Sequence, residues 1–136
     1  MNKFIFRVVV SATLSLSAYS SPEKSCQVIR GVFDIGSGST KMKVFKWDEC
    51  QDILLKEFKD CADHKKVAYK EDLKNSHELK QTTIELGIKK LSELKKKAIS
   101  CGATQFSGAA TSAFRQAKNG EVAANYIAFK TGIRVQ

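Results

Sequence analysis

The feature that most constrains the fold is a glycine–serine tetrapeptide at 36–39 (GSGS), which separates two runs of strand-forming residues. The run at 28–35 reads VIRGVFDI, and the run at 40–47 reads TKMKVFKW. β-Branched and aromatic residues in short runs favour strands, and glycines permit a tight turn between them. A third run covers 53–58, or continues past a lysine-rich interruption towards Val67. The sequence therefore predicts an antiparallel three-stranded meander.

A long helix is expected after the meander. Asn75 can cap it, Glu78 has the spacing that completes a capping box, and Gly102 ends it. Apolar residues between these signals recur at helical spacing, which predicts one buried stripe. The stripe consists of Ile84, Ile88, Leu91, Leu94 or Lys95, and Ala98.

The remaining segments are shorter. Residues 104–110 (TQFSGAA) predict a strand, a short helix follows up to 117, and a second helix covers 121–130 between an Asn119 cap and Gly132. A last strand begins at Ile133, close to the end of the sequence, so we expect a truncated domain. The order β-β-β-α-β-α-α-β predicts an α/β fold, with a mixed sheet whose fourth strand is parallel to the first.

The first twenty residues have the pattern of a secretory signal peptide. They contain no acidic residue, carry Lys3 and Arg7, and continue with an apolar and small-residue stretch at 8–18. Ala18 and Ser20 then form a small-X-small cleavage site. The prediction is a signal peptide at 1–20, a single domain at 21–136, and a secreted or periplasmic location. The alternative is a buried N-terminal strand.

The four cysteines lie after this segment, and disulfides persist in such a compartment. Three complete pairings are open, and the absence of a CxxC pair argues against a zinc site. Cys26 lies twelve residues before Gly38, and Cys50 lies twelve residues after it. Equal distances from a hairpin turn bring residues opposite each other, which predicts a disulfide between Cys26 and Cys50. Cys101 is the main competitor, and Cys61 is expected to be remote and unpaired.

The loop between the first two strands is the strongest candidate for chemistry. Its glycines allow close approach of the backbone to a ligand, and its amide groups with the hydroxyls of Ser37, Ser39 and Thr40 can converge on phosphate oxygens. Lys41 adds a cation, and Asp34 can hold a metal or orient a water. The formal net charge of +9 is compatible with an anionic partner. The alternatives are a plain hairpin turn for the loop and a solvated basic surface for the charge.

The stretch VFDIGSGSTKMKVF resembles the first phosphate loop of the exopolyphosphatase / guanosine pentaphosphate phosphohydrolase (Ppx/GppA) family. A second stretch, AATSAFRQAKNG at 109–120, resembles another motif of that family and contributes Arg115. Gly38 stands where the family more often has Asn, and Lys41 where Arg is usual. The resemblance implies a ribonuclease H-like fold of the actin and hexokinase superfamily. The candidate phosphate-binding residues are Asp34, Gly36, Ser37, Gly38, Ser39, Thr40, Lys41 and Arg115.

The resemblance also implies an activity. The family members hydrolyse phosphoanhydride bonds of inorganic polyphosphate or a guanosine polyphosphate with a divalent metal, Mg²⁺, and are often homodimers. The implied partner is a phosphate polyanion, with no nucleic acid and no membrane span after signal removal. The catalytic glutamate and a second phosphate loop are expected beyond Gln136, so this chain alone is expected to be inactive. The alternatives are a non-catalytic polyanion-binding module, an inactive remnant, or a kinase of the same superfamily.

Overall fold

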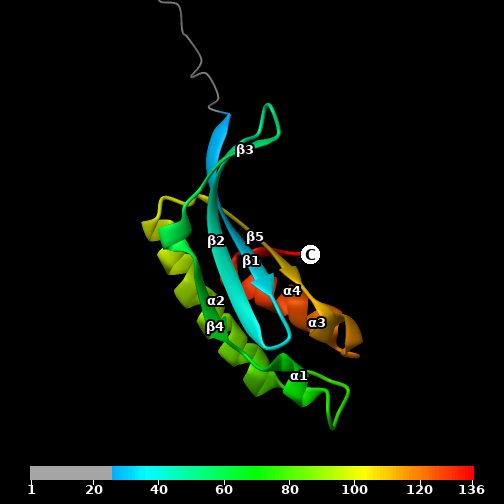
Figure 1. Ribbon diagram of the computed structural model, residues 1–136. Coiled ribbons are helices and arrows are strands. Elements are labelled where there is room, and N and C mark those ends of the chain that lie inside the picture. The colour runs from blue at the N-terminus through cyan, green and yellow to red at the C-terminus, as the bar shows by residue number, and fades with distance from the viewer. Residues whose placement is uncertain (1–25) are drawn as a thin grey trace, which may run out of the picture.

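A computed structural model describes residues 26–136 (Figure 1). The signal-peptide prediction for 1–20 lies outside the described residues. The described chain forms a sheet with the strand order β3-β2-β1-β5-β6, and a further strand, β4, also pairs with β2. The strands are β1 (Gln27–Ile35), β2 (Ser39–Asp48), β3 (Ile53–Glu57), β4 (Asp63–Lys66), β5 (Gln105–Ala110) and β6 (Arg134–Val135). The helices are η1 (Lys59–Cys61, 3₁₀), α1 (Tyr69–Asp72), α2 (Gln81–Ser100), α3 (Ser112–Gln116) and α4 (Gly120–Thr131).

The hairpin of β1 and β2 organises the sheet. The two strands pair without interruption from Gln27 opposite Asp48 to Ile35 opposite Thr40. This register places apolar side chains on one face, where they are buried, and a one-residue slip would expose all of them. The fully buried residues of this face are Phe33, Ile35, Met42 and Val44. The predicted meander is therefore confirmed, and β5 runs parallel to β1 as expected.

The third predicted run is not one continuous strand. It splits into β3 and β4, with η1 between them, and both pieces pair antiparallel with β2. The register shifts between Lys46 and Trp47, and the Phe58 N–H donates to the Val44 carbonyl where β3 leaves the sheet. The irregularity lets the chain turn and return to β2 nearer to the hairpin turn.

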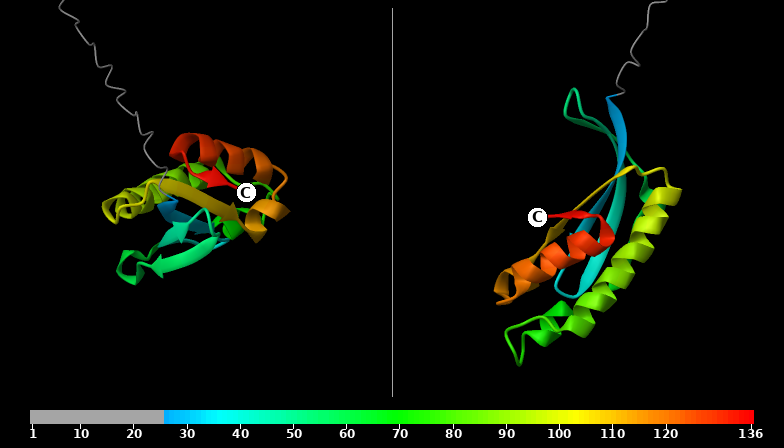
Figure 2. Two further views of the ribbon diagram at one scale, coloured as in Figure 1. Left: turned by 90° about the horizontal axis from the view of Figure 1, so that it is seen from above. Right: turned by 180° about the vertical axis from the view of Figure 1, so that it is seen from behind.

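Both long helices cover the same face of the sheet (Figure 2). Helices α2 and α4 pack against each other, and side chains from both complete the core under β1 and β2. No described element covers the opposite face, where Val32 of β1 is 36% exposed. No helix within residues 26–136 has the length and apolarity that crossing a membrane requires. The sheet thus has a packed face and an open face.

Helix α2 starts later than the capping signals predict. Its N-cap position is Lys80, and the Lys80 N–H donates to the buried carboxylate of Asp72 at 2.9 Å. The predicted Asn75 cap is therefore wrong, because Asp72 supplies the acceptor from outside the helix. The predicted stripe is confirmed in its main members, with Leu94 rather than Lys95 in the core. The buried residues of α2 are Ile84, Gly87, Leu91, Leu94 and Ala98.

Helix α4 starts after Asn119, but the Asn119 side chain does not cap it. Instead this amide exchanges two hydrogen bonds of 2.9 Å with the backbone of Leu79, which ties α4 to the segment before α2. Gly120 follows, and a Cβ there would lie 1.7 Å from the Phe114 carbonyl oxygen, so α3 and α4 meet backbone to backbone. The helix ends at Thr131, and Gly132 follows it with a φ of 62°, the left-handed conformation expected of a glycine that terminates a helix.

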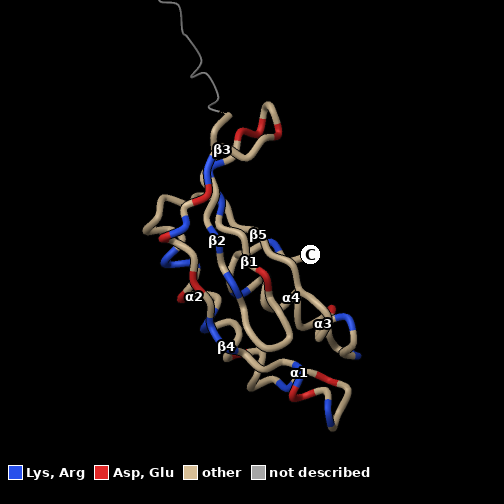
Figure 3. Tube along the Cα trace, viewed as in Figure 1, with Lys and Arg blue, Asp and Glu red and all other residues tan. Residues whose placement is uncertain are grey.

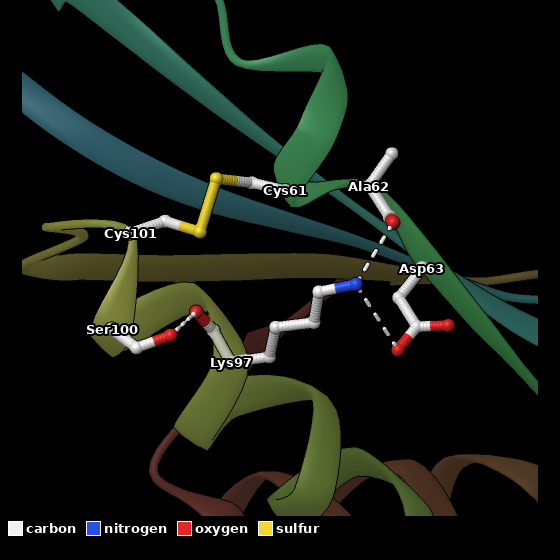
Figure 4. The surroundings of a disulfide bond; sticks show 6 residues. All are labelled: Cys61, Ala62, Asp63, Lys97, Ser100 and Cys101. Atoms are coloured by element: carbon white, nitrogen blue, oxygen red, sulfur yellow. Dashed lines mark hydrogen bonds and ion pairs between the residues drawn. A yellow bond between two sulfur atoms is a disulfide. The ribbon is translucent and has the colours of Figure 1, made fainter.

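Two disulfides brace the fold. Cys26 pairs with Cys50, the pair that their equal distance from the turn predicts, with 5.4 Å between the Cα atoms. The expectation for Cys61 is wrong, because it pairs with Cys101. Since β4 leads from Cys61 towards the hairpin turn, Cys61 lies at the far end of β4 from the loop, beside the end of α2 (Figure 4).

An ion pair lies next to this second disulfide. The Lys97 ammonium donates to the Ala62 carbonyl at 3.2 Å and lies 3.5 Å from the Asp63 carboxylate (Figure 4). Burial acts to raise the pKa of Asp63, but the His64 backbone N–H and the Lys97 and Lys65 ammonium groups outweigh it and hold this pKa below its usual range. The disulfide and the ion pair together join η1 and β4 to α2.

Candidate functional site

The loop between β1 and β2 is closed by a short hydrogen bond. The Gly36 N–H donates to the Ser39 carbonyl at 2.9 Å, and a Cβ on Gly36 would lie 2.8 Å from that same oxygen. Glycine is therefore required at this position by close backbone approach. At Gly38, by contrast, a Cβ would meet no atom within 4 Å, so the tip of the loop borders open space.

The carbonyl groups of the loop accept hydrogen bonds from the segment that follows β4, whereas two of its backbone N–H groups have no acceptor in the described part of the chain. The Ser37 carbonyl accepts from the Lys70 N–H at 3.0 Å, and the Gly38 carbonyl accepts from the Val67 N–H at 3.3 Å. Within residues 26–136, the N–H groups of Ser37 and Gly38 donate to no protein acceptor. Backbone N–H groups are obligatory donors, and successive ones in a turn form an anion-binding nest. The loop therefore presents donors to a ligand.

The second motif meets the first at this loop. Ser112 begins α3 directly after β5, and its Oγ lies 2.7 Å from the Oγ of Ser37. The Ala113 N–H also donates to the Ser37 Oγ at 3.2 Å, and the Thr111 N–H donates to the Ile35 carbonyl. Both motifs thus lie at the carboxyl ends of adjacent parallel strands, which is where ligands of open α/β sheets gather.

Arg115 lies at the same end of the sheet as the loop, on α3 (Figure 1). Its side chain is exposed, and its guanidinium has no hydrogen-bond or ion-pair partner among residues 26–136. The structure thus places Arg115 at the loop's end of the sheet.

Thr40 differs from its neighbours. Its side chain is fully buried on the helix-covered face, and its Oγ1 has no hydrogen-bond partner in the described part of the chain. The Thr40 hydroxyl therefore lies in the core rather than among the loop's outward donors. Asp34 and Lys41 lie opposite each other on the open face, and both are exposed.

Asp34 is the carboxylate that the loop motif offers to a metal ion. The described residues hold one cluster of three ligand-type groups, formed by Cys26, Asp48 and Cys50, and both of its sulfur atoms belong to a disulfide. A metal near the loop would have one carboxylate, Asp34, from the loop motif itself. This donor set fits Mg²⁺, which is commonly held by one or two carboxylates together with substrate phosphates and water.

Strand β4 brings two further residues to the loop that no motif indicated. Lys66 lies opposite Ser39, and His64 lies opposite Lys41. Both side chains are exposed. The predicted continuation of the third strand towards Val67 placed them near β2, but their register opposite the loop depends on where the chain returns to β2 after η1.

No protein-family model matches this sequence, and no curated protein matches it. Solved structures do match. A Ppx/GppA family member from Aquifex aeolicus aligns with a TM-score of 0.63 and 23% identity, over 81% of this chain and 34% of that chain. The fold is that of the Ppx/GppA proteins.

Two other structures extend this result. An exopolyphosphatase from Cytophaga hutchinsonii aligns with a TM-score of 0.62 and 15% identity, over 79% of this chain and 33% of that chain. An exopolyphosphatase-like protein aligns with a TM-score of 0.63 and 19% identity, over 82% and 32% of the two chains. The chain therefore spans about a third of the length of the structures that it matches.

Proposed function

We propose that this chain binds the phosphate groups of an inorganic polyphosphate or a guanosine polyphosphate, as part of a phosphoanhydride hydrolase of the exopolyphosphatase type. The observation that carries the proposal is the pair of unpartnered N–H groups on Ser37 and Gly38, beside the exposed Lys41. Oriented N–H groups together with a cation are the arrangement that stabilises phosphate oxygens. The Ppx/GppA-type fold supports the same proposal.

The proposed division of roles follows from the placement of the groups. The Ser37 and Gly38 amides hold phosphate oxygens, and Lys41 neutralises charge as a point cation. Arg115 reaches a neighbouring phosphate with its two-pronged guanidinium. Mg²⁺, held by Asp34 and the phosphates, would supply charge neutralisation as a Lewis acid. Two disulfides fit an oxidising compartment, which supports a secreted or periplasmic location.

We assign phosphate binding to the loop between β1 and β2. Hydrolysis of polyphosphate would require a general base and a second phosphate loop in addition to it. Hydrolysis requires a water aligned with the scissile bond, and one loop does not bracket both sides of that bond. A release assay for inorganic phosphate with Mg²⁺ and polyphosphate is therefore expected to give turnover far below about 1 s⁻¹, the lower end of ordinary enzymes. Turnover at or above that rate would contradict the assignment.

A second candidate is a polyanion-binding module without a catalytic partner. The exposed Lys66 of β4, which lies opposite the loop residue Ser39, favours it, because this lysine enlarges the basic surface beyond the two motifs. The two candidates share the same binding site and differ in whether polyphosphate hydrolysis appears once the rest of a Ppx/GppA-type domain is supplied.

Binding can be tested by nuclear magnetic resonance on the oxidised chain. Titration with inorganic phosphate and then pyrophosphate is expected to shift the amide signals of Ser37 and Gly38, while the turn residue Asp52 serves as a distant control. Lys41→Ala should weaken pyrophosphate binding about fivefold, the effect of losing one contact worth about 1 kcal/mol in water. Lys96→Ala, a matched loss of an exposed lysine on α2, should change it less than twofold. Unshifted loop amides, or equal effects of the two variants, would refute the proposal.

A further inference from the structure

The end of the β1–β2 hairpin that lies far from the phosphate loop carries a cluster of groups that can bind a metal ion. The sulfur atoms of Cys26 and Cys50 and a carboxylate oxygen of Asp48 all lie within 4.8 Å of one another. The two sulfur atoms form a disulfide in this structure. Once that bond is reduced, the same place holds two thiols beside a carboxylate. Thiolate sulfur and carboxylate oxygen are both ligands of Zn²⁺ in proteins.

Backbone hydrogen bonds hold these three residues together independently of the disulfide. Beyond the last pair of β1 and β2, the Glu49 N–H donates to the Cys26 carbonyl at 2.8 Å. The Oδ1 atom of Asp48 accepts from the N–H groups of Cys50 and Gln51 at 2.9 and 3.0 Å, which fixes the carboxylate beside Cys50. Reduction of the disulfide breaks none of these hydrogen bonds. The ligand groups therefore remain together in the reduced chain.

The local charge at this end of the hairpin favours a cation. Residues 48–52 (DECQD) include three acidic residues and no lysine or arginine, in a chain whose formal net charge is +9. Figure 3 shows these acidic positions at the turn between β2 and β3. Glu49 is paired with Arg30 at 2.9 Å, whereas Asp48 and Asp52 have no ion-pair partner among residues 26–136. Two carboxylates thus remain uncompensated in the turn that carries Cys50.

We propose that Cys26, Cys50 and Asp48 form a Zn²⁺ site when the Cys26–Cys50 disulfide is reduced, with water as the fourth ligand. A dithiol reductant breaks the S–S bond, yields two protein thiols and is itself oxidised to a disulfide. Binding of Zn²⁺ then releases one proton from each thiol to the solvent. Zn–S bonds of about 2.3 Å in a tetrahedral site place the two sulfur atoms about 3.8 Å apart. The Cα atoms are 5.4 Å apart, so rotation of the side chains achieves this separation. This inference does not depend on the proposed function.

The donor set favours Zn²⁺ over other metal ions. Mg²⁺ and Ca²⁺ prefer oxygen ligands, so two thiolates do not suit them. Cu⁺ prefers soft sulfur ligands and has little use for a carboxylate, so dependence on Asp48 distinguishes a zinc site from a copper site. The cysteines lack the CxxC spacing of many zinc sites, because strand pairing rather than proximity in the sequence brings Cys26 to Cys50.

The second disulfide provides a matched control in the same chain. Cys61 and Cys101 also give two adjacent thiols on reduction, but no third ligand group among residues 26–136 completes a cluster with them. Zn²⁺ binding to the reduced full chain is measured by competition with a chromophoric chelator. The variant Cys61→Ser with Cys101→Ser should bind one Zn²⁺ as tightly as the unchanged chain. The variant Cys26→Ser with Cys50→Ser should bind at least about tenfold more weakly, because losing direct ligands costs no less than losing the outer groups that orient them.

Two single substitutions test Asp48 as a ligand. Asp48→Asn keeps an oxygen for the N–H groups of Cys50 and Gln51 but removes the anionic ligand, and it should weaken Zn²⁺ binding at least about tenfold. Asp52→Asn removes the same charge from the same turn outside the cluster, and asparagine tolerates the φ of 54° at this position. It should weaken binding less than about threefold, the effect of an exposed charge that is not a ligand.

Circular dichroism of each reduced variant reports whether it is folded. If reduction unfolds the chain, Zn²⁺ should restore the folded spectrum only in variants that keep Cys26, Cys50 and Asp48. Equal Zn²⁺ affinities of the two cysteine-pair variants overturn the proposal, as does a reduced chain that Zn²⁺ neither binds nor refolds. Equal effects of Asp48→Asn and Asp52→Asn also overturn it, because Asp48 would then act through its charge alone.

Discussion

The disulfide between Cys61 and Cys101 allows a quantitative prediction of its contribution to the free energy of unfolding. It closes a loop with a sequence separation of 40, whereas the Cys26–Cys50 disulfide spans 24. A cross-link stabilises the folded state mainly by restricting the unfolded chain, and the restriction grows with the logarithm of the loop length. The loop-entropy relation gives about 4 kcal/mol for the Cys61–Cys101 loop and about 3.5 kcal/mol for the Cys26–Cys50 loop.

The perturbation is the double substitution Cys61→Ser with Cys101→Ser, compared with Cys26→Ser and Cys50→Ser together. Replacing both cysteines of a pair avoids a free thiol that could exchange with the remaining disulfide. The ion pair of Lys97 with Asp63 remains in the first variant, so α2 and β4 keep a contact at the same place. The comparison therefore measures the cross-link rather than the loss of the whole contact.

The assay is urea unfolding followed by circular dichroism, with the unchanged oxidised chain as reference. The Cys61/Cys101 variant should lose about 4 kcal/mol of unfolding free energy, equivalent to a fall in Tm of about 15 °C for a domain of this size. The Cys26/Cys50 variant should lose slightly less. A loss below about 1 kcal/mol from the Cys61/Cys101 variant would refute the reasoning, because its unfolded chain would then already be as restricted as the cross-linked one.

Three further predictions concern single residues. Burial raises the pKa of Tyr69 well above its ordinary value of 10.0, so stability should fall at alkaline pH above that value, and Tyr69→Phe should abolish this loss in pH-dependent thermal melts. Gly120→Ala should cost about 2–3 kcal/mol in urea unfolding, since its Cβ would meet the Phe114 carbonyl; an unchanged midpoint would contradict the backbone contact. The pKa of Asp63 is held below its ordinary value of 3.8 in the folded chain. The Asp63 carboxylate therefore stabilises the fold above pH 3.8, and this stabilisation is lost as the pH falls through the lower folded pKa. Asp63→Asn should make the Tm, measured in thermal melts at acidic pH, depend less on pH in this range.

Local sequence signals predict the β1–β2 hairpin and the disulfide that depends on its register. The glycine–serine turn and the alternating runs at 28–35 and 40–47 predict β1 and β2, and the symmetric spacing of Cys26 and Cys50 about Gly38 predicts their pairing. The periodic apolar residues likewise predict the stripe of α2. These features depend on residues close in sequence, or on a register that one buried face enforces. The two motifs also predict where the loop and α3 lie, because both follow adjacent parallel strands.

Only the tertiary structure determines the remaining features, which are contacts between segments that lie far apart in the sequence. No local sequence pattern specifies which distant segments meet. Asp72 holds the start of α2, and Asn119 binds Leu79 across 40 residues instead of capping its own helix. The interruption at η1 sends β4 back along β2 and brings Cys61 beside Cys101. The same return sets Lys66 opposite Ser39, next to the loop. The order of residues along β4 does not indicate this position, because it depends on the register with β2.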